Sequence, residues 1–342
     1  MYGMKTVIDI LDRAKTSAIQ DSDVLSEIEQ RRIELRKEQQ KVCDQRTALS
    51  RLIRERSRQE ELNEILTAAI MEGAMQPLDY SPAEPIVSDN DLLVSLNDIH
   101  YGANINNFWN TYNSEICHEM MRRYLDYIIQ IGIMHQSENC VVWANGDLIN
   151  GSIHHSIAVT NKENVIEQIT GVSELIAGFL SVLSRHFSHV YFVSVAGNHS
   201  RMDIKERALK DERLDDLVEW YLKARLQNFE NVTVGASQKI DSTMYIINVR
   251  GKNYVGVHGD YDNSKEKVQS LKTMAGGDVY AVLSAHLHHN KQDVVQGVKT
   301  IMAGSFLGVD DFCVSKRIIG RPEQMVCVCD ENGIRCTYDI PL

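Results

Sequence analysis

Proline and cysteine are scarce in this chain, with five prolines and seven cysteines in 342 residues. No two cysteines form a C-x-x-C pair, and Cys327 and Cys329 alternate along a strand-like run, so packing explains them better than zinc binding. Reduced thiols of this kind are typical of the cytoplasm. No apolar run is long enough to span a membrane, and the N-terminus lacks the apolar core of a signal peptide. We therefore expect a soluble, cytoplasmic protein without a membrane partner.

Positive charge is also in deficit. The sequence has 36 lysines and arginines against 47 aspartates and glutamates, which gives a formal net charge of −11. This balance excludes a protein that binds nucleic acid over its whole surface, and it restricts any such contact to a local patch. The length is sufficient for one domain with a substantial core and an appendage.

Glycine and proline are absent from Lys5 to Glu72, a stretch that is crowded with charged residues. Apolar side chains recur in it every seven residues, at Ile28, Leu35, Val42 and Leu49. We predict that residues 1–75 form a helical arm, either one long helix or a hairpin. Three interpretations stay open: a solvated helix, an oligomerising arm, and a nucleic-acid clamp that uses the arginines between 51 and 58.

A second domain is predicted to begin after the arm. Prolines cluster in residues 76–86, which indicates a linker, and residues 87–342 follow as the larger domain. Strand-like runs first alternate with helix-like runs: Ser114–Ile133, Lys162–Arg185 and Lys205–Leu226. Mostly strands follow. This order is typical of an α/β domain in which two sheets pack face to face.

An apolar strand that ends in a metal-compatible side chain occurs five times. The first strand, around Val94, ends at Asp98 and His100, which the strand tip can present on one side. The other strands end at Asp147, at Asn198 and His199, at His258, and at His286 and His288. One such instance is weak evidence for a metal site. Five in succession are hard to explain by core packing, and they predict a site built from oxygen and nitrogen donors.

Together these segments resemble the calcineurin-like metallophosphoesterase superfamily. The blocks that carry the resemblance are Asp98-Ile99-His100, Gly146-Asp147, Gly197-Asn198-His199, His258 and Ala285-His286-Leu287-His288. Ala285 stands where the family has glycine, and Ser200 stands where an acidic residue commonly follows. Neither departure removes a ligand, although Ser200 changes the hydrogen bonding expected around His199. The resemblance implies a four-layer α/β/β/α sandwich, to which the helical arm is an addition.

The resemblance also implies two divalent metal ions, Mn²⁺ first, with Mg²⁺, Fe and Zn²⁺ as alternatives. Asp98, His100, Asp147 and His288 would hold one ion, and Asp147, Asn198, His258 and His286 the other. Asp147 would bridge them, because a carboxylate has two oxygens and can hold cations about 3.5–4 Å apart. The neutral amide oxygen of Asn198 suits Mn²⁺, Fe or Mg²⁺ better than a structural zinc site.

Catalytic roles in the family fall on two of these residues. His199 is implied as the acid that protonates the departing alkoxide, and Asp98 as a group that steers His199. Substrate contacts are expected from a less specific set: His154, His155, Tyr101, Lys316, Arg317 and Arg321. The three basic residues among them form a local cluster that suits a phosphate backbone, although a solvated loop explains them equally well.

Three further blocks, Asp98–Gly102, Gly146–Ile149 and Gly304–Asp311, resemble bacterial and phage DNA-repair exonucleases. We therefore predict a phosphodiesterase, specifically a DNA nuclease, that uses water activated by the metal pair and a histidine general acid. A small-molecule phosphodiesterase or phosphatase acting on cyclic or linear nucleotides is the first alternative. A scaffold with a vestigial site is the second. DNA is the expected partner, and the N-terminal helices are a candidate surface for a homo-oligomer.

Overall fold

The computed structural model describes residues 31, 33–38, 40–42, 44–45, 77–153, 160–203, 205, 207–262 and 265–342. The chain divides into two units, Met1–Gln76 and Pro77–Leu342. In the first unit, the described residues are all helical and all exposed. Most of the expected arm, including Arg51–Arg58, lies outside the described residues, so its form and role remain predictions.

The first sheet of the second unit has the strand order β14-β13-β1-β4-β5-β6. Its strands are β1 (Asp91–Ser95), β4 (Asn139–Ala144), β5 (His189–Ser194), β6 (Val232–Val234), β13 (Glu323–Asp330) and β14 (Gly333–Pro341). Strands β1, β4, β5 and β6 run parallel to one another, whereas β13 is antiparallel to both β1 and β14. Parallel strands are covered on both faces, which explains why β1 is buried along its whole length.

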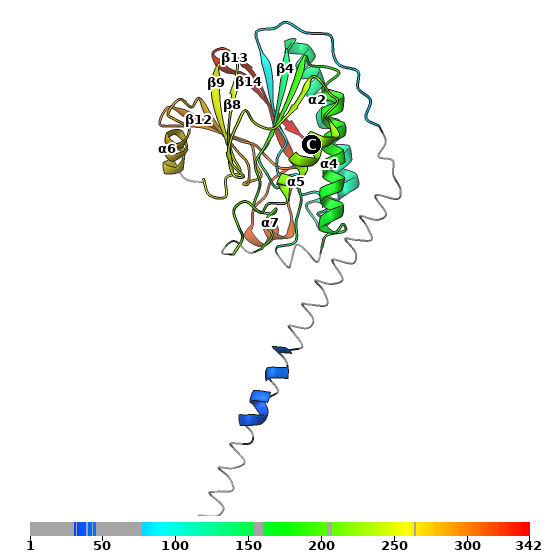
Figure 1. The fold of residues 1–342 in the computed structure, drawn as a ribbon, viewed down its shortest axis with the longest axis vertical. Coiled ribbons are helices and arrows are strands. Elements are labelled where there is room, and N and C mark those ends of the chain that lie inside the picture. The colour runs from blue at the N-terminus through cyan, green and yellow to red at the C-terminus, as the bar shows by residue number, and fades with distance from the viewer. Residues whose placement is uncertain are drawn as a thin grey trace, which may run out of the picture. The chain divides into compact units, whose positions relative to one another are not determined.

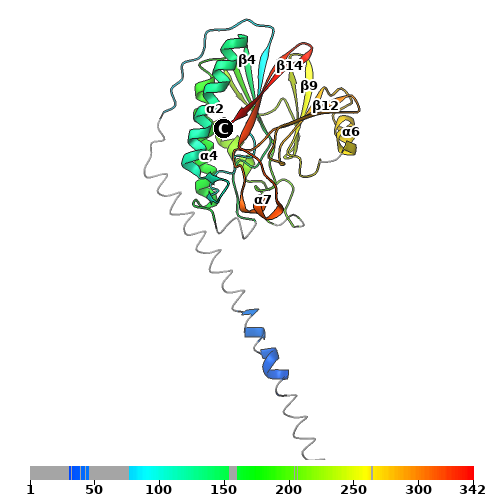
Figure 2. The same ribbon diagram turned by 180° about the vertical axis from the view of Figure 1, so that it is seen from behind.

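Three helices pack against this sheet: α2 (Ser114–His135), α4 (Val165–Leu183) and α5 (Asp215–Arg225). Figures 1 and 2 both show α2 and α4 side by side along it. Helix α4 begins at a capping box formed by Asn164 and Glu167. It is long and apolar enough to cross a membrane by length and composition alone. Its apolar side chains, among them Val172 and Ile176, lie in the core of the unit, which accounts for that composition.

The second sheet has the order β11-β12-β10-β9-β8-β7. Its strands are β7 (Gln238–Asp241), β8 (Met244–Val249), β9 (Lys252–Val257), β10 (Ala281–Ser284), β11 (Lys291–Val295) and β12 (Val298–Met302). Strands β9, β10 and β12 are parallel to one another. The remaining short elements are the hairpin of β2 (Ile105–Asn106) and β3 (Thr111–Tyr112), and helices α6 (Lys265–Met274) and α7 (Asp311–Lys316).

Side chains alternate between the two faces of each strand, and the apolar ones form three clusters. In β4, Val142 faces the cluster shared with α2 and α4, whereas Trp143 faces the cluster shared with the second sheet. A third cluster joins the second sheet to Val268 and Leu271 of α6. Apolar clusters therefore flank both sheets, and the mixed α/β fold expected from the sequence is confirmed.

One predicted helix is shorter than the sequence suggested. The prediction covered Lys205–Leu226, whereas α5 begins at Asp215. The backbone N–H of Leu214 donates to the carbonyl of Ser200 (2.9 Å), and Arg213 forms a β-bridge with Arg201. These residues form hydrogen bonds with the loop that follows β5, so the helix begins only after them.

Candidate metal centre

The candidate ligands all follow the carboxyl ends of parallel strands. Strands β1, β4 and β5 of the first sheet lead to Asp98 and His100, to Asp147, and to Asn198 and His199. Strands β9 and β10 of the second sheet lead to His258, and to His286 and His288. Parallel strands end at a common edge, so each sheet delivers its own donors to one place.

These loops contain a concentration of unusual backbone. Nine non-glycine residues in the described part of the chain have positive φ, and five of them are candidate ligands: Asp98, His100, Asp147, His286 and His288, with φ between 48° and 74°. The other four have ordinary explanations, since Gln136 and Arg317 end helices, and Arg250 and Gln296 precede glycines in tight turns. Positive φ costs free energy in non-glycine residues and gathers at functional sites.

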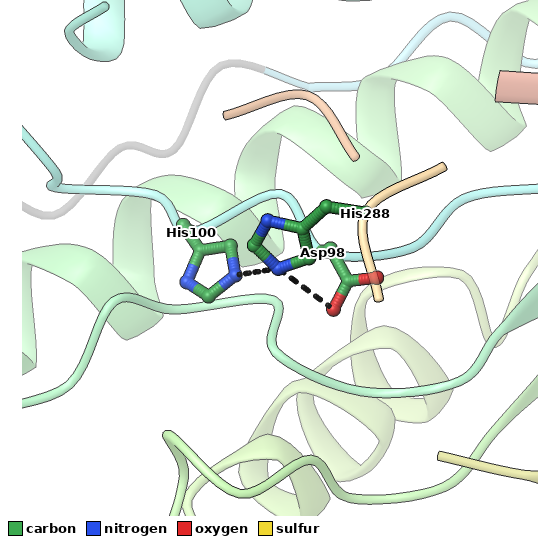
Figure 3. A group of neighbouring side chains, drawn as sticks. All are labelled: Asp98, His100 and His288. Atoms are coloured by element: carbon green, nitrogen blue, oxygen red, sulfur yellow. Dashed lines mark hydrogen bonds and ion pairs between the residues drawn. The ribbon is translucent and has the colours of Figure 1, made fainter. Parts of the chain in front are cut away.

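The first donor group consists of Asp98, His100 and His288 (Figure 3). The Nε2 atoms of His100 and His288 lie 3.2 Å apart, and Nε2 of His288 lies 3.8 Å from Oδ1 of Asp98. Oδ1 of Asp98 and Nδ1 of His100 are buried without a hydrogen-bond partner. A buried carboxylate oxygen without a partner is costly, and a cation held between these three side chains would satisfy it.

The second donor group consists of Asp147, His258 and His286. Nε2 of His258 lies 3.2 Å from Oδ2 of Asp147 and 3.0 Å from the amide oxygen of Asn198. Nδ1 of His258 donates to the carbonyl of Asn145 (2.6 Å), which directs Nε2 toward the other donors. Outer contacts of this kind fix the orientation of metal-binding histidines.

A third group, His100, Asp147 and His199, connects the other two. It shares His100 with the first group and Asp147 with the second, so the donors of both sheets form one continuous cluster. The backbone N–H of His199 donates to Oδ1 of Asp147 (2.7 Å), and Nδ1 of the ring donates to the carbonyl of Asn150 (2.8 Å). The ring of His199 meets that of His100 edge-on at 4.5 Å.

Burial and mutual charge shift the protonation of these groups. Burial raises the pKa of Asp98 well above its ordinary value. Burial also lowers the pKa of two histidines: the pKa of His100 falls well below its ordinary value, and the pKa of His288 falls to about 4. Burial alone would also raise the pKa of Asp147, but the charges of His258 and His199 outweigh it and hold that pKa well below its usual range. Asp147 in turn outweighs the burial of His258 and raises its pKa to about 10.

These shifts suit a cation site. His100 and His288 are held as neutral imidazoles, which is the form that binds metal. The proton on His258 balances the buried charge of Asp147, and a cation bound by the two side chains would take its place.

Asp215 is a buried residue of this site that the sequence pattern did not reveal. Oδ2 of Asp215 accepts hydrogen bonds from the backbone N–H groups of Asp147 (3.1 Å) and Gly197 (2.9 Å), so it ties together the loops after β4 and β5. Burial, reinforced by the charge of Asp147, raises its pKa to about 6. Asp215 is the first residue of α5, where an acid ordinarily indicates only a favourable helix start. In the sequence, the one hint of such a residue was Ser200, which stands where an acidic residue was expected. In the structure, the hydroxyl of Ser200 donates to the carbonyl of Gly197 (2.8 Å).

The hydrogen bonds described for Asp98 and His199 go to different backbone groups, and the role expected for Asp98 beside His199 stays a prediction. The ring of His199 donates to Asn150, whereas Oδ2 of Asp98 accepts from the backbone N–H of His286 (2.9 Å). Asp98 therefore orders the loop after β10, and the carbonyl of Asn150 orients His199.

The expected substrate contacts are dispersed. Tyr101 is 7 % exposed and belongs to the apolar core, with its hydroxyl beside His118 of α2 (3.3 Å). His154 and His155 lie outside the described residues. Lys316, Arg317 and Arg321 lie in an exposed segment, Ser315–Arg321. A Cβ placed on Gly320 of that segment would be 3.7 Å from the carbonyl oxygen of His288, so the segment adjoins the donor cluster.

Comparisons with known proteins give distant similarities. No family model matches this chain. An uncharacterized SPbeta prophage-derived protein of Bacillus subtilis (strain 168), YonJ, is 20% identical over 304 residues, which cover 86% of this chain and 74% of that protein.

Solved structures with similarity to this chain have low scores. An archaeal phosphodiesterase has a TM-score of 0.38 and 11% identity, covering 73% of this chain and 99% of its own. A Vps29 mutant from Entamoeba histolytica has a TM-score of 0.36 and 11% identity, covering 73% and 99%. A predicted phosphoesterase from Streptococcus pneumoniae TIGR4 has a TM-score of 0.32 and 11% identity, covering 75% and 100%. The case for a function therefore rests on the geometry of the donor cluster.

Proposed function

We propose that this protein is a dinuclear-metal-dependent phosphodiesterase of the calcineurin-like type, and specifically a DNA nuclease. The observation that carries the proposal is the continuous cluster of three donor groups, linked through His100 and Asp147. Two of these groups hold separate sets of donors, and each set combines residues that follow strands of both sheets, as a bridged metal pair between the sheets requires. The apolar clusters on both faces of each sheet support the four-layer α/β/β/α sandwich that the resemblance implies.

The donor chemistry fits divalent cations. Asp98, His100, His288 and Asp147 would hold one ion, and Asp147, Asn198, His258 and His286 the other. The unpartnered Oδ1 of Asp98 and the strained backbone of five ligands are the costs expected of a site shaped for such ions. Carboxylate, imidazole and amide donors without thiolate favour Mn²⁺. Bound there, the ions would supply charge to a phosphodiester and lower the pKa of water toward about 7.

His199 is the proposed general acid. Its Nδ1 donates to the carbonyl of Asn150, which fixes the orientation of the ring. Its place in the linking group, with His100 and Asp147, supports this role, because a phosphodiester bound by the two ions would lie beside the ring. Protonation of the departing alkoxide is the role that the reaction requires of a side chain here.

DNA is proposed as the substrate because exposed basic residues adjoin the cluster. Lys316, Arg317 and Arg321 belong to the exposed segment beside His288. Local positive charge of this kind can receive a phosphate backbone even when the whole chain carries a net charge of −11. The exposed helical residues of the first unit, including Leu35 and Val42, support the further proposal that the N-terminal helices mediate oligomerisation.

The test compares three substrates in Mn²⁺: bis(4-nitrophenyl) phosphate, linear DNA and cyclic nucleotides. We expect hydrolysis of the small diester and of DNA, and neither activity in Asp147→Asn. Activity on the small diester and on nucleotides but not on DNA would assign the site to small-molecule substrates. Absence of all three activities, with Mn²⁺ bound, would favour the scaffold alternative.

A further inference from the structure

Two aromatic side chains are exposed at the turn between β2 and β3. Phe108 is 91 % exposed and Trp109 is 52 % exposed, and their rings meet edge-on with centroids 5.3 Å apart. Aromatic residues supply large apolar surfaces that proteins usually bury. An adjacent exposed pair therefore indicates a surface that contacts another molecule.

Hydrogen bonds hold the turn in a fixed shape. The side-chain oxygen of Asn107 accepts from the backbone N–H groups of Trp109 and Asn110, both at 2.9 Å. The side-chain amide of Asn107 donates to the carbonyl of Val309 (3.3 Å), and that of Asn110 donates to the carbonyl of Leu307 (2.6 Å). The aromatic pair is thus attached to the segment after β12, and little ordering would be needed on binding.

The same segment supports the donor cluster. The backbone carbonyl of Asp98 accepts from the hydroxyl of Ser305 (3.0 Å) and from the N–H of Phe306 (3.1 Å). On the other side, the hydroxyl of Tyr112 in β3 donates to the carbonyl of Ile99. The hairpin is therefore connected to the first ligand loop directly through Tyr112 and indirectly through the segment after β12.

Basic residues come directly after the same segment in the chain. Helix α7 ends at Lys316, and every residue from Ser315 to Arg321 is exposed. Two acids also lie near this segment: Asp311 accepts from Asn107 (3.4 Å), and Glu323 pairs with Arg321 (3.1 Å). Aromatic rings next to positive charge are the combination by which proteins bind single-stranded nucleic acid.

We propose that Phe108 and Trp109 form a stacking platform for unpaired bases of a single-stranded DNA substrate, and that Lys316 and Arg317 receive its phosphates. The inference rests on the proposed function and specifies its substrate, since the platform would position an unpaired strand end beside the donor cluster. Stacking is tolerant of sequence, because every base has an aromatic face. Single-stranded DNA is preferred over a protein partner because the basic segment complements phosphate.

The experiment measures fluorescence anisotropy of a labelled oligo-dT strand and of a duplex, without added metal, for the full chain. The double variant Phe108→Ala/Trp109→Ala should bind the single strand about 5- to 150-fold more weakly, which is the usual effect of losing base stacking. Its kcat/KM on the single strand should fall relative to that on bis(4-nitrophenyl) phosphate. The matched control is Trp220→Ala, a side chain 68 % exposed on α5, which should bind as the wild type does.

Each outcome decides the inference. Weaker binding of the single strand, greater than any change on duplex, supports the platform. Equal binding by variant and wild type overturns it and assigns the aromatic pair to a protein contact, while hydrolysis of the small diester still supports the proposed function. A wild type that cannot hydrolyse the small diester refutes the proposed function, whereas the anisotropy comparison still decides about the platform.

Discussion

Two buried aspartates stand at opposite ends of the β1 segment, and their surroundings differ. Asp91, at the start of β1, accepts from the guanidinium of Arg250 (2.7 Å) and from the side chain of Asn139 (2.8 Å). Asp98, just beyond the end of β1, is fully buried and has one oxygen without a hydrogen-bond partner. Arg250 supplies a cation to Asp91 from the chain itself, whereas at Asp98 we propose that a bound metal ion does so. The comparison separates a charge that is paired within the fold from one that is proposed to hold an ion.

The largest effect is expected from Asp147, the residue proposed to bridge the metal pair. Asp147→Asn should reduce metal-dependent turnover of bis(4-nitrophenyl) phosphate below detection, because both of the proposed ions lose a charged ligand. His258→Ala should do the same. Both variants should keep the circular dichroism spectrum of the wild type. Asp91→Asn is the matched control: it should retain turnover and lose stability. Full activity in Asp147→Asn would remove the site from consideration.

A smaller loss is expected from His199, which is proposed to give a proton and not to hold metal. His199→Ala should lower turnover by about 10²–10⁴-fold, the usual effect of removing a positioned general acid. Mn²⁺ content, measured by elemental analysis after dialysis, should stay at the wild-type level. Loss of metal together with activity would instead identify His199 as a ligand.

A still smaller loss is expected from Asp215, a positioning residue that contacts two ligand loops through backbone N–H groups. Asp215→Asn should weaken Mn²⁺ binding by about 10–100-fold, since outer contacts commonly contribute that much to metal affinity. Isothermal titration with Mn²⁺ gives this value directly. Asp216→Asn, whose carboxylate pairs with Lys239 (3.1 Å), is the neighbouring control and should bind Mn²⁺ normally. Equal affinities for the two variants would contradict the positioning role.

The comparison also shows what a sequence can reveal. The sequence predicted that side chains such as Asp98 and His258 lie together, because strand ends and residue types are both visible in it, and the structure groups them. The mixed α/β class followed from the order of the elements. The contacts of Asp215 and of the Asn150 carbonyl were not predicted. Asp215 accepts from backbone N–H groups and His199 donates to a backbone carbonyl, and every residue type has such backbone groups. Tyr101 was expected at the substrate because it follows His100 in the chain, whereas in the structure it belongs to the apolar core, and adjacency in sequence does not reveal that difference.

The smallest effect on turnover is expected at the Asp91 end, where stability alone should respond. Arg250 also bonds Glu138 (2.8 Å), and that hydrogen bond holds the pKa of Glu138 below its ordinary value of 4.5. A lowered pKa means that the folded state binds protons less readily than the unfolded state, so this contribution is present above about pH 4.5 and is lost as the pH falls further. Arg250→Ala should therefore lower the free energy of unfolding by about 1–2 kcal/mol at pH 7, after allowance for partial exposure. Urea denaturation should show the difference from wild type shrinking below pH 4.5, with turnover at pH 7 unchanged. A difference that is constant with pH would mean that Arg250 stabilises the fold by packing and not by its charge.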